Sequence, residues 1–286
     1  MMKKINLVKS FPTIIIILTF LFSCNRELKD LSPDGASTAN NEIVNEAYSL
    51  DVDDLSSAAV LGAPNSGGRE EAIHTGIDDP SNCAKITIEV GIEPHSGIIT
   101  VDFGTTGCKD SKGHVRKGKM IITYAGKRFV PGSSVKVELV DYFINDRKVE
   151  GTRIVTSEPT STELKPVSKI VLKDGKCTSP DGTFSTHEFT HVRTWIRSSN
   201  RLEDSWTVSG FGSGVSRKGV AYTMTITKDL VFKKSCEASH VFIAVSGIKV
   251  LNKGGKEITI DYGNGICNNL VSVTYNGVTR VIEIKR

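Results

Sequence analysis

One stretch of the chain matches a known catalytic motif. His187-Glu188-Phe189-Thr190-His191 has the form H-E-x-x-H, which on a helix brings two imidazoles to one zinc ion, with the glutamate as general base. The surrounding residues 184–197 alternate like a strand and are rich in β-branched types, which predicts a strand. In a strand the two histidines would lie about 13 Å apart, too far to share one ion. We therefore expect a chance match on an exposed strand, with no catalytic residue and no metal. The alternative is a secreted zinc-dependent hydrolase using His187, Glu188 and His191.

A basic cluster is the second group of residues that could do chemistry. Seven bases fall within twenty positions, opposed only by Asp110: Lys109, Lys112, Arg116, Lys117, Lys119, Lys127 and Arg128. Such a cluster is typical either of a solvated hairpin tip or of a contact with phosphate or carboxylate groups, such as those of lipopolysaccharide or another envelope glycan. Four aromatic residues could stack on sugars or pack in a core: Trp195, Trp206, Tyr142 and Phe143.

The N-terminus indicates where these side chains would act. Residues 1–23 carry three lysines and no acid, and they include the twelve-residue apolar run 11–22. This run is shorter than the roughly 20 residues that span a bilayer, which predicts an export signal peptide and not a membrane helix. It ends at Leu21-Phe22-Ser23-Cys24, which resembles a bacterial lipobox. The resemblance implies that Cys24 becomes the first residue, with a diacylglycerol thioether and an amide-linked fatty acid such as palmitate.

A lipidated Cys24 would make the membrane the first partner of this protein. Two or three acyl chains anchor a protein stably, whereas a single chain does so only marginally. We expect a lipoprotein of the cell envelope, held to an envelope membrane by its lipid and facing either the periplasm or the surface. Nucleic acid is not an expected partner outside the cell.

Composition divides the remaining chain into an acidic and a basic part. The 286 residues are 38% hydrophobic and 24% charged, which excludes disorder throughout, and 26 glycines without a period exclude a collagen-like chain. Residues 25–82 hold 3 bases and 12 acids, whereas residues 83–286 hold 30 bases and 20 acids. The first part also carries Gly-Pro-Ser stretches, so we expect a flexible acidic tether over 24–82, with at most a short helix between Glu42 and Leu61.

Period-two patterning begins after Cys83. Ile86, Ile88, Val90 and Ile92 alternate with polar or small residues, and the same alternation recurs at 99–103, 135–139 and 241–245. Turn sequences separate the runs, and Asn276-Gly277 between two apolar runs is a strong hairpin pattern. The pattern predicts an all-β, antiparallel body over 83–286, either a meander or a sandwich.

Two segments of this body repeat one another. Ile99-Thr-Val-Asp-Phe-Gly104 and Ile258-Thr-Ile-Asp-Tyr-Gly263 each lie between two cysteines and are followed by a similar apolar strand. The repeat defines related units at 83–138 and 236–286, connected by strands in 139–235. At each Asp-aromatic-Gly corner we expect the aspartate to cap its own backbone and the glycine to take an unusual φ.

The repeat also predicts the disulfides. In each copy one cysteine precedes the first strand of a hairpin and another follows its second strand, so Cys83–Cys108 and Cys236–Cys267 are the natural pairs. Export permits disulfides, and each bridge would stabilise the folded state by roughly 3 kcal/mol because it closes a loop in the unfolded chain. A metal site is not expected because no Cys-x-x-Cys is present. Cys177 is left over as a buried free thiol.

The repeated residues resemble a family. Residues 99–118 follow the pattern Ile-Thr-Val-Asp-Phe-Gly-x-x-Gly-Cys-x-Asp-x-x-Gly-x-x-Arg-x-Gly, which is similar to a motif of uncharacterised envelope lipoproteins from Bacteroidetes-type bacteria. Residues 145–153, 206–214 and 261–269 also resemble that family. The resemblance implies a lipid-anchored β-protein of the outer envelope and no particular activity. Taken together, the sequence predicts a non-enzymatic binding or structural lipoprotein that contacts anionic envelope glycans, without a cofactor; its oligomeric state is left open.

Overall fold

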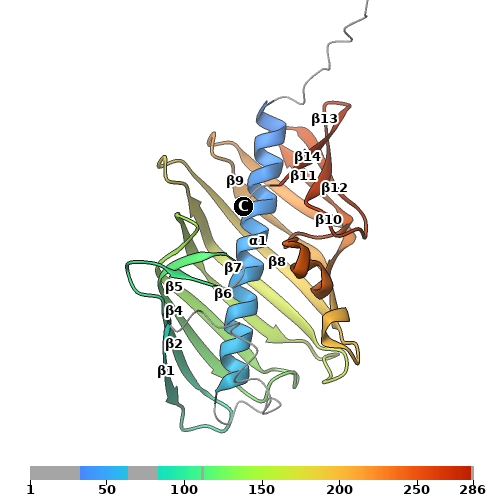
Figure 1. Cartoon of the computed structure of the whole chain (residues 1–286). Helices are drawn as coiled ribbons and strands as arrows, with labels where there is room; N and C mark the ends of the chain where they lie inside the picture. The colour runs from blue at the N-terminus through green and yellow to red at the C-terminus, as the bar shows by residue number, and fades with distance from the viewer. Residues whose placement is uncertain (1–32, 64–82, 111–112, 285–286) are drawn as a thin grey trace, which may run out of the picture. The chain divides into compact units, whose positions relative to one another are not determined.

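Strands that follow one another along the chain also lie side by side in one antiparallel sheet (Figure 1). The computed structural model describes residues 33–63, 83–110 and 113–284. The strands are β1 Lys85–Val90, β2 Gly97–Asp102, β3 Cys108–Lys109, β4 Val115–Ala125, β5 Ser134–Ile144, β6 Arg147–Ser157, β7 Val167–Thr178, β8 Phe184–Ile196, β9 Ser205–Val215, β10 Ala221–Lys233, β11 Ser246–Lys253, β12 Lys256–Asn264, β13 Leu270–Tyr275 and β14 Val278–Glu283. The predicted all-β antiparallel class is confirmed.

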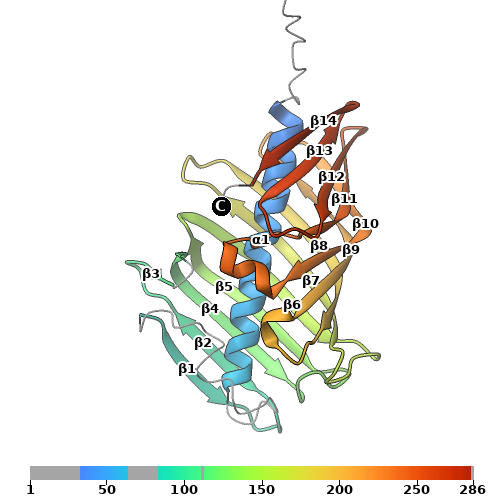
Figure 2. The same ribbon diagram turned by 45° about the vertical axis from the view of Figure 1, so that its right-hand side comes forward.

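The sheet is a meander and not a sandwich. Its order runs β1-β2-β4 and then consecutively to β14, with the short β3 pairing β4 beside this path. The only helices after residue 82 in the described chain are two short 3₁₀ turns, η2 Arg201–Glu203 and η3 Lys234–Ser239. The sheet curves strongly, so that its first and last strands bend toward the same side of the molecule (Figure 2).

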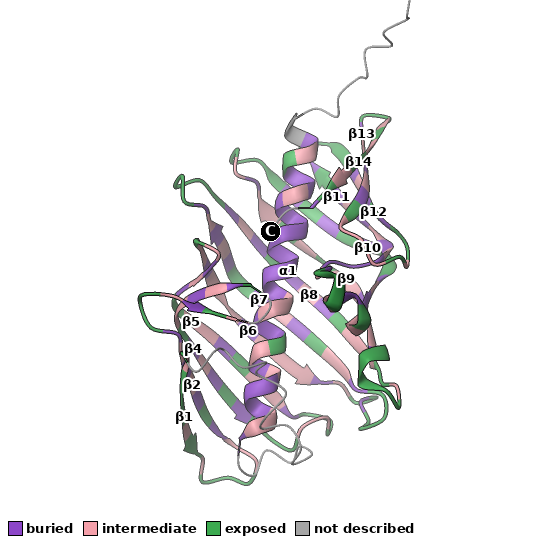
Figure 3. Ribbon diagram, in the orientation of Figure 1, coloured by how far each residue is buried: buried purple, intermediate pink, exposed green. Residues whose placement is uncertain are grey.

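A 30-residue helix, α1 Pro33–Gly62, lies along the concave face of this sheet (Figures 1 and 2). Its side chains are buried almost all around, including Ile43, Tyr48 and Val52 and several polar residues (Figure 3). The prediction of a flexible tether over 24–82 is therefore wrong for this stretch, which forms part of the core.

The length and burial of the helix were missed because many of its buried positions are polar. Pro33–Gly62 contains six acidic residues and no lysine, arginine or histidine, and its apolar residues form no continuous stripe of period 3.6. Its carboxylates instead meet basic side chains on the inner face of the sheet, which sequence proximity cannot show. Among the helices of the described chain, none is long and apolar enough to cross a membrane.

The two repeated units form the two ends of the sheet. The Asp102 carboxylate accepts a hydrogen bond from the Gly104 backbone N–H at 2.9 Å, and Asp261 accepts one from Gly263 at 2.8 Å. Both glycines have positive φ, which confirms the predicted corner. The strand pairing differs, because Ile99 lies opposite Ile122 whereas its counterpart Ile258 lies opposite Tyr275, two residues further along the partner strand.

One predicted strand is absent. Residues 241–245 alternate in sequence, but they follow η3 as irregular chain, and β11 begins only at Ser246. His240 closes η3 in a left-handed conformation with φ of 54°, which turns the chain inward. Val241, Ile243 and Val245 are then buried as loop residues. Burial of apolar side chains, and not strand pairing, produced the alternation.

Both predicted disulfides are present. Cys83 and Cys108 have Cα atoms 5.5 Å apart, and Cys236 and Cys267 have Cα atoms 5.1 Å apart, which suits a disulfide. Each bridge fastens the chain next to one repeated hairpin. Cys177 is buried and outside any disulfide, as predicted.

Candidate functional site

The H-E-x-x-H residues lie on strand β8, so the predicted strand is confirmed, but the predicted exposure is wrong for the histidines. His187 and His191 face inward and are buried, with the Phe189 ring stacked between them. Glu188 is exposed on the opposite face, where its carboxylate accepts a hydrogen bond from the Asp174 backbone N–H at 2.9 Å. The three side chains do not converge. Across the described residues, no group of three or more His, Cys, Asp or Glu side chains could hold a metal ion.

The seven clustered bases do not form one surface patch. Arg116 points into the core and binds Asp51 of the helix through two hydrogen bonds of 3.2 and 2.6 Å. Three lysines lie near separate carboxylates: Lys117 near Asp146 at 3.7 Å, Lys119 near Asp102 at 3.0 Å, and Lys127 near Glu163 at 3.5 Å. Lys109 is exposed on β3, and Lys112 and the lipidation candidate Cys24 lie outside the described residues. Arg128 lines the pocket described below.

The first half of helix α1 is held by what we call the Lys249 cluster: Glu42, Glu46, Lys249, Tyr222 and Tyr262. The fully buried Lys249 ammonium lies 3.2 Å from Glu42 and 2.9 Å from Glu46. The Tyr222 hydroxyl donates to Glu42 at 2.7 Å, and the Tyr262 hydroxyl donates to Glu46 at 3.2 Å. Tyr222 reaches the helix by lying over Gly214, where an added Cβ would come within 2.6 Å of its hydroxyl.

Two carboxylates share one lysine in this cluster, so their pKa values separate. Burial alone would raise the pKa of Glu42, but Lys249, His187 and Tyr222 together hold it below its ordinary value. Burial and the neighbouring Glu42 charge raise the pKa of Glu46. Burial alone would lower the pKa of Lys249, yet Glu46 and Glu42 raise it. The cluster thus holds a charged lysine between two acids of unequal strength.

The second half of α1 meets arginines instead. The Arg153 guanidinium on β6 donates hydrogen bonds from its Nε and Nη2 atoms to the buried Asp53 carboxylate. Arg193 on β8 adds a third hydrogen bond to the same carboxylate at 3.3 Å. Among the residues that the structure describes, one carboxylate here binds two guanidinium groups, so positive charge exceeds negative charge around Asp53.

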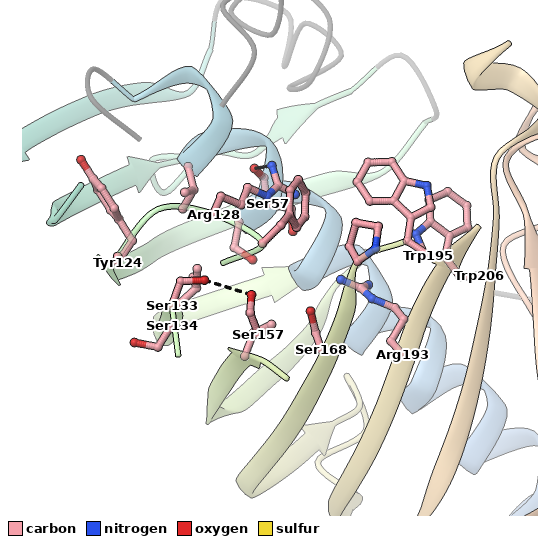
Figure 4. Close-up of a pocket in the computed structure, with 17 residues that line it drawn as sticks. Ser57, Tyr124, Arg128, Ser133, Ser134, Ser157, Ser168, Arg193, Trp195 and Trp206 are labelled. Atoms are coloured by element: carbon pink, nitrogen blue, oxygen red, sulfur yellow. Dashed lines mark hydrogen bonds between the residues drawn. The ribbon is translucent and has the colours of Figure 1, made fainter. Parts of the chain in front are cut away.

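A pocket opens beside Arg193, at the C-terminal end of α1 (Figure 4). Its empty space, counted out to the open mouth and including open solvent, is about 690 Å³. We call it the arginine pocket. Its charged, aromatic and hydroxyl-bearing lining residues are Arg128, Arg193, Phe129, Trp195, Trp206, Tyr124, Ser56, Ser57, Ser133, Ser134, Ser157 and Ser168.

Arg128 enters this pocket from the β4–β5 loop. Its guanidinium donates to the Ser57 carbonyl in the last turns of α1 at 3.2 Å and lies 4.5 Å from the centre of the Phe129 ring. The side chain is half-buried. Burial, together with the charges of Arg193 and Arg197, lowers the pKa of Arg128 to about 9. In the part of the chain that the structure describes, no carboxylate forms an ion pair with it.

Trp195 and Trp206 form the aromatic wall of the pocket. They lie opposite one another on β8 and β9, with ring centres 6.1 Å apart and planes inclined by 22°. The Trp195 indole N–H donates to Asp204 at 3.0 Å, and the Arg197 guanidinium lies 4.3 Å from the Trp195 ring centre. Tyr142, also predicted as a stacking residue, is instead buried in the core against Phe103, and Phe143 is half-buried on β5 outside the pocket lining.

Three arginines of this region were not predicted from the sequence: Arg153, Arg193 and Arg197. A pattern that could have found the last two is Arg193-x-Trp195-x-Arg197, since alternate residues of a strand share one face. Arg128, four strands away in the meander, could be joined to them only by the curvature of the sheet.

Comparison with known proteins finds no match: no family model, no curated protein and no solved structure matches the chain.

Proposed function

We propose that this protein is a non-enzymatic, lipid-anchored envelope protein that binds anionic glycan material in the arginine pocket. The ligand class is a saccharide bearing phosphate or carboxylate groups, such as lipopolysaccharide or an acidic polysaccharide.

The observation that carries the proposal is the charge balance of the pocket. Arg128 and Arg193 both line it, and within the described residues the one carboxylate bound to either of them is Asp53, which Arg153 also binds. Like charges gathered in a half-buried site raise the free energy of the site, and an anion would lower it. A guanidinium presents a planar fork of donors that matches carboxylate and phosphate groups.

The rest of the lining suits a sugar. Six serines supply hydroxyl groups around the arginines, and two of them, Ser133 and Ser157, already bond to each other at 2.9 Å. Two tryptophans supply flat apolar surface on one wall. Pockets that combine aromatic surface with a few placed polar groups are typical of small-ligand sites.

The location that the sequence predicts supports an envelope ligand. The lipobox-like end of residues 1–23 favours attachment to a membrane, and residues 83–286 carry ten more bases than acids. Such a basic body would be attracted to anionic envelope polymers, and this attraction weakens with salt.

Calorimetric titration of the full-length protein with lipopolysaccharide, and separately with a uronic-acid oligosaccharide, tests the proposal. Arg128→Gln should weaken binding by about tenfold to a hundredfold, because a charge-assisted hydrogen bond in a half-buried site is lost. Lys127→Gln is the matched control, since this neighbouring side chain is exposed and lies near Glu163; its affinity should stay within about twofold of the parent.

A double variant distinguishes binding in the pocket from binding to surface bases. The protein carrying both Lys117→Glu and Lys119→Glu reverses two bases outside the pocket, and its affinity should be nearly unchanged. If neither ligand binds at low salt, or if Arg128→Gln binds as well as the parent protein, the proposal is wrong.

A further inference from the structure

Strand β1 is one open edge of the sheet. It pairs with β2 along one side, and along its other side no strand of the described chain pairs with it. Its residues Lys85, Ile86, Thr87 and Glu89 are exposed. Natural proteins usually protect such edges, because unpaired backbone groups recruit further strands.

The direction of the free backbone groups on β1 follows from the hairpin. The Gly91 N–H donates to the Ser96 carbonyl at 2.9 Å, which makes 91 and 96 a hydrogen-bonded pair of the β1–β2 register. Hydrogen-bonded and non-hydrogen-bonded pairs alternate along antiparallel strands. The backbone groups of Ile86, Ile88 and Val90 therefore point away from β2, toward the open edge.

We propose that two copies of this chain associate through β1, in antiparallel pairing centred on Thr87. In this register Ile86 and Ile88 exchange backbone hydrogen bonds with Ile88 and Ile86 of the second copy. Lys85 then lies opposite Glu89 of the second copy, and Glu89 lies opposite its Lys85. These residues occupy non-hydrogen-bonded pairs, where side chains approach most closely and opposite charges stabilise the pairing.

Strand sequence selects this register. Because only even-numbered residues of β1 offer their backbone to the edge, the neighbouring permitted registers are centred on Ile86 or Ile88. Neither of these places Lys85 opposite Glu89. Residues 85–89, Lys-Ile-Thr-Ile-Glu, are symmetric about Thr87 except for the sign of the end charges, which is the pattern that two-fold self-pairing requires.

The inner face of β1 supplies apolar surface to the same contact. Ile86 is 42% exposed and Val90 is 56% exposed. Both lie on the inner face of the sheet, and the residues of β2 on that same face are buried. Pairing of two β1 strands would bring Ile86 of each copy beside Ile88 of the other, which removes apolar surface from water.

The opposite edge of the sheet lacks these features. The Ile284 N–H donates to the Asn269 carbonyl at 2.8 Å, so Thr279, Val281 and Glu283 direct their backbone to the β14 edge. Self-pairing of β14 would place Arg280 opposite its own copy or opposite an apolar residue. Only β1 is self-complementary, so a closed dimer is expected and not a growing filament.

Cysteine cross-linking of the full-length protein in its membrane tests the pairing. Thr87→Cys should form a disulfide-linked dimer on mild oxidation, because Cα atoms of a non-hydrogen-bonded pair lie about 4.5 Å apart. Thr100→Cys is the matched control: Thr100 lies directly opposite Thr87 on β2, one strand away from the edge, and it should yield little dimer.

Charge reversal then tests the register. On a background of Thr87→Cys, either Lys85→Glu or Glu89→Lys should slow cross-linking about tenfold, because two attractive pairs become repulsive. The double reversal should restore it, with unchanged melting temperatures of the reduced proteins as the control for folding. Equal cross-linking at positions 87 and 100, or no rescue by the double reversal, would overturn the proposal. Cross-linking of Thr87→Cys to another protein would assign the edge to a different partner and equally contradict self-pairing.

Discussion

Two clusters, one in each half of helix α1, have opposite arrangements of charge. In the Lys249 cluster, two carboxylates of the helix share one lysine and two tyrosine hydroxyls. Around Asp53, one carboxylate is shared by Arg153 and Arg193, and Arg128 lies nearby without an acidic partner among the described residues. The first arrangement is short of positive charge, and the second has it in excess.

This difference separates a cluster that holds the helix from a cluster that could also bind a ligand. Lys249 is fully buried among its partners from the helix, so its contacts hold the helix. Arg128 and Arg193 are half-buried at a pocket open to solvent, where an added anion could complete the charge balance. The same helix thus closes one end of the concave face and shapes a site at the other.

Removal of Lys249 should have the largest effect on stability. Lys249→Met leaves Glu42 and Glu46 buried without a cation, which should lower the free energy of unfolding by about 3–5 kcal/mol. Urea denaturation followed by circular dichroism measures this loss. Lys228→Met, an exposed position on β10, should cost less than about 0.5 kcal/mol. A loss below about 1 kcal/mol for Lys249→Met would show that the cluster does not fasten the helix.

Acid should weaken the fold through the histidines that lie between the two halves. Burial lowers the pKa of His187 to about 4, with Arg153 and Lys249 acting in the same direction and Glu42 opposing them. An unfolded histidine titrates near 6.5, so between these values the unfolded chain binds a proton that the folded chain does not. Stability is therefore complete above pH 6.5 and falls as the pH drops toward 4, by about 3 kcal/mol from His187 alone.

Two further groups modify this pH dependence. Burial also lowers the pKa of His191, which adds to the loss, whereas the raised pKa of Glu46 opposes it. Urea midpoints measured from pH 7 to pH 4 should fall less steeply for His187→Asn than for the parent protein. His240→Asn, at an exposed position, should follow the parent curve. Parallel curves for the parent and His187→Asn would contradict the assignment.

Removal of one arginine from Asp53 should have a smaller effect than removal of Lys249. In Arg193→Gln the Asp53 carboxylate keeps both bonds to Arg153, so the cost should be about 1 kcal/mol. The same urea experiment measures it. A loss as large as that of Lys249→Met would mean that Asp53 needs Arg193 as well as Arg153. Arg193 would then not be part of an excess of positive charge, and the contrast between the two clusters would be lost.

The strands, their antiparallel class and the two disulfides could be predicted because each depends on local pattern. One face of each strand meets the core, so every second residue is apolar and buried, as at Ile99, Val101 and Phe103. The helix could not be predicted in this way. Its buried Glu42 bonds to Tyr222, 180 residues later, and its Asp53 bonds to Arg153, 100 residues later.

The site was only partly predictable for the same reason. Arg128 and the two tryptophans were candidates by residue type, but the bases beside Arg128 in the sequence point elsewhere or meet acids of their own. Proximity of Arg128 to Arg193 arises from the curvature of the sheet and from the end of α1, neither of which leaves a periodic pattern in the sequence. Ion pairs across a curved sheet are set by tertiary structure alone.

Tryptophan fluorescence gives the most direct test of the arginine pocket. The chain contains only two tryptophans, and both line this pocket, so a change in their emission reports on it alone. Titration of the full-length protein with a uronic-acid oligosaccharide should give a saturable change that Arg128→Gln weakens at least about tenfold and that added salt reduces. No change in emission, or an equal change with neutral dextran, would contradict an anionic ligand in this pocket.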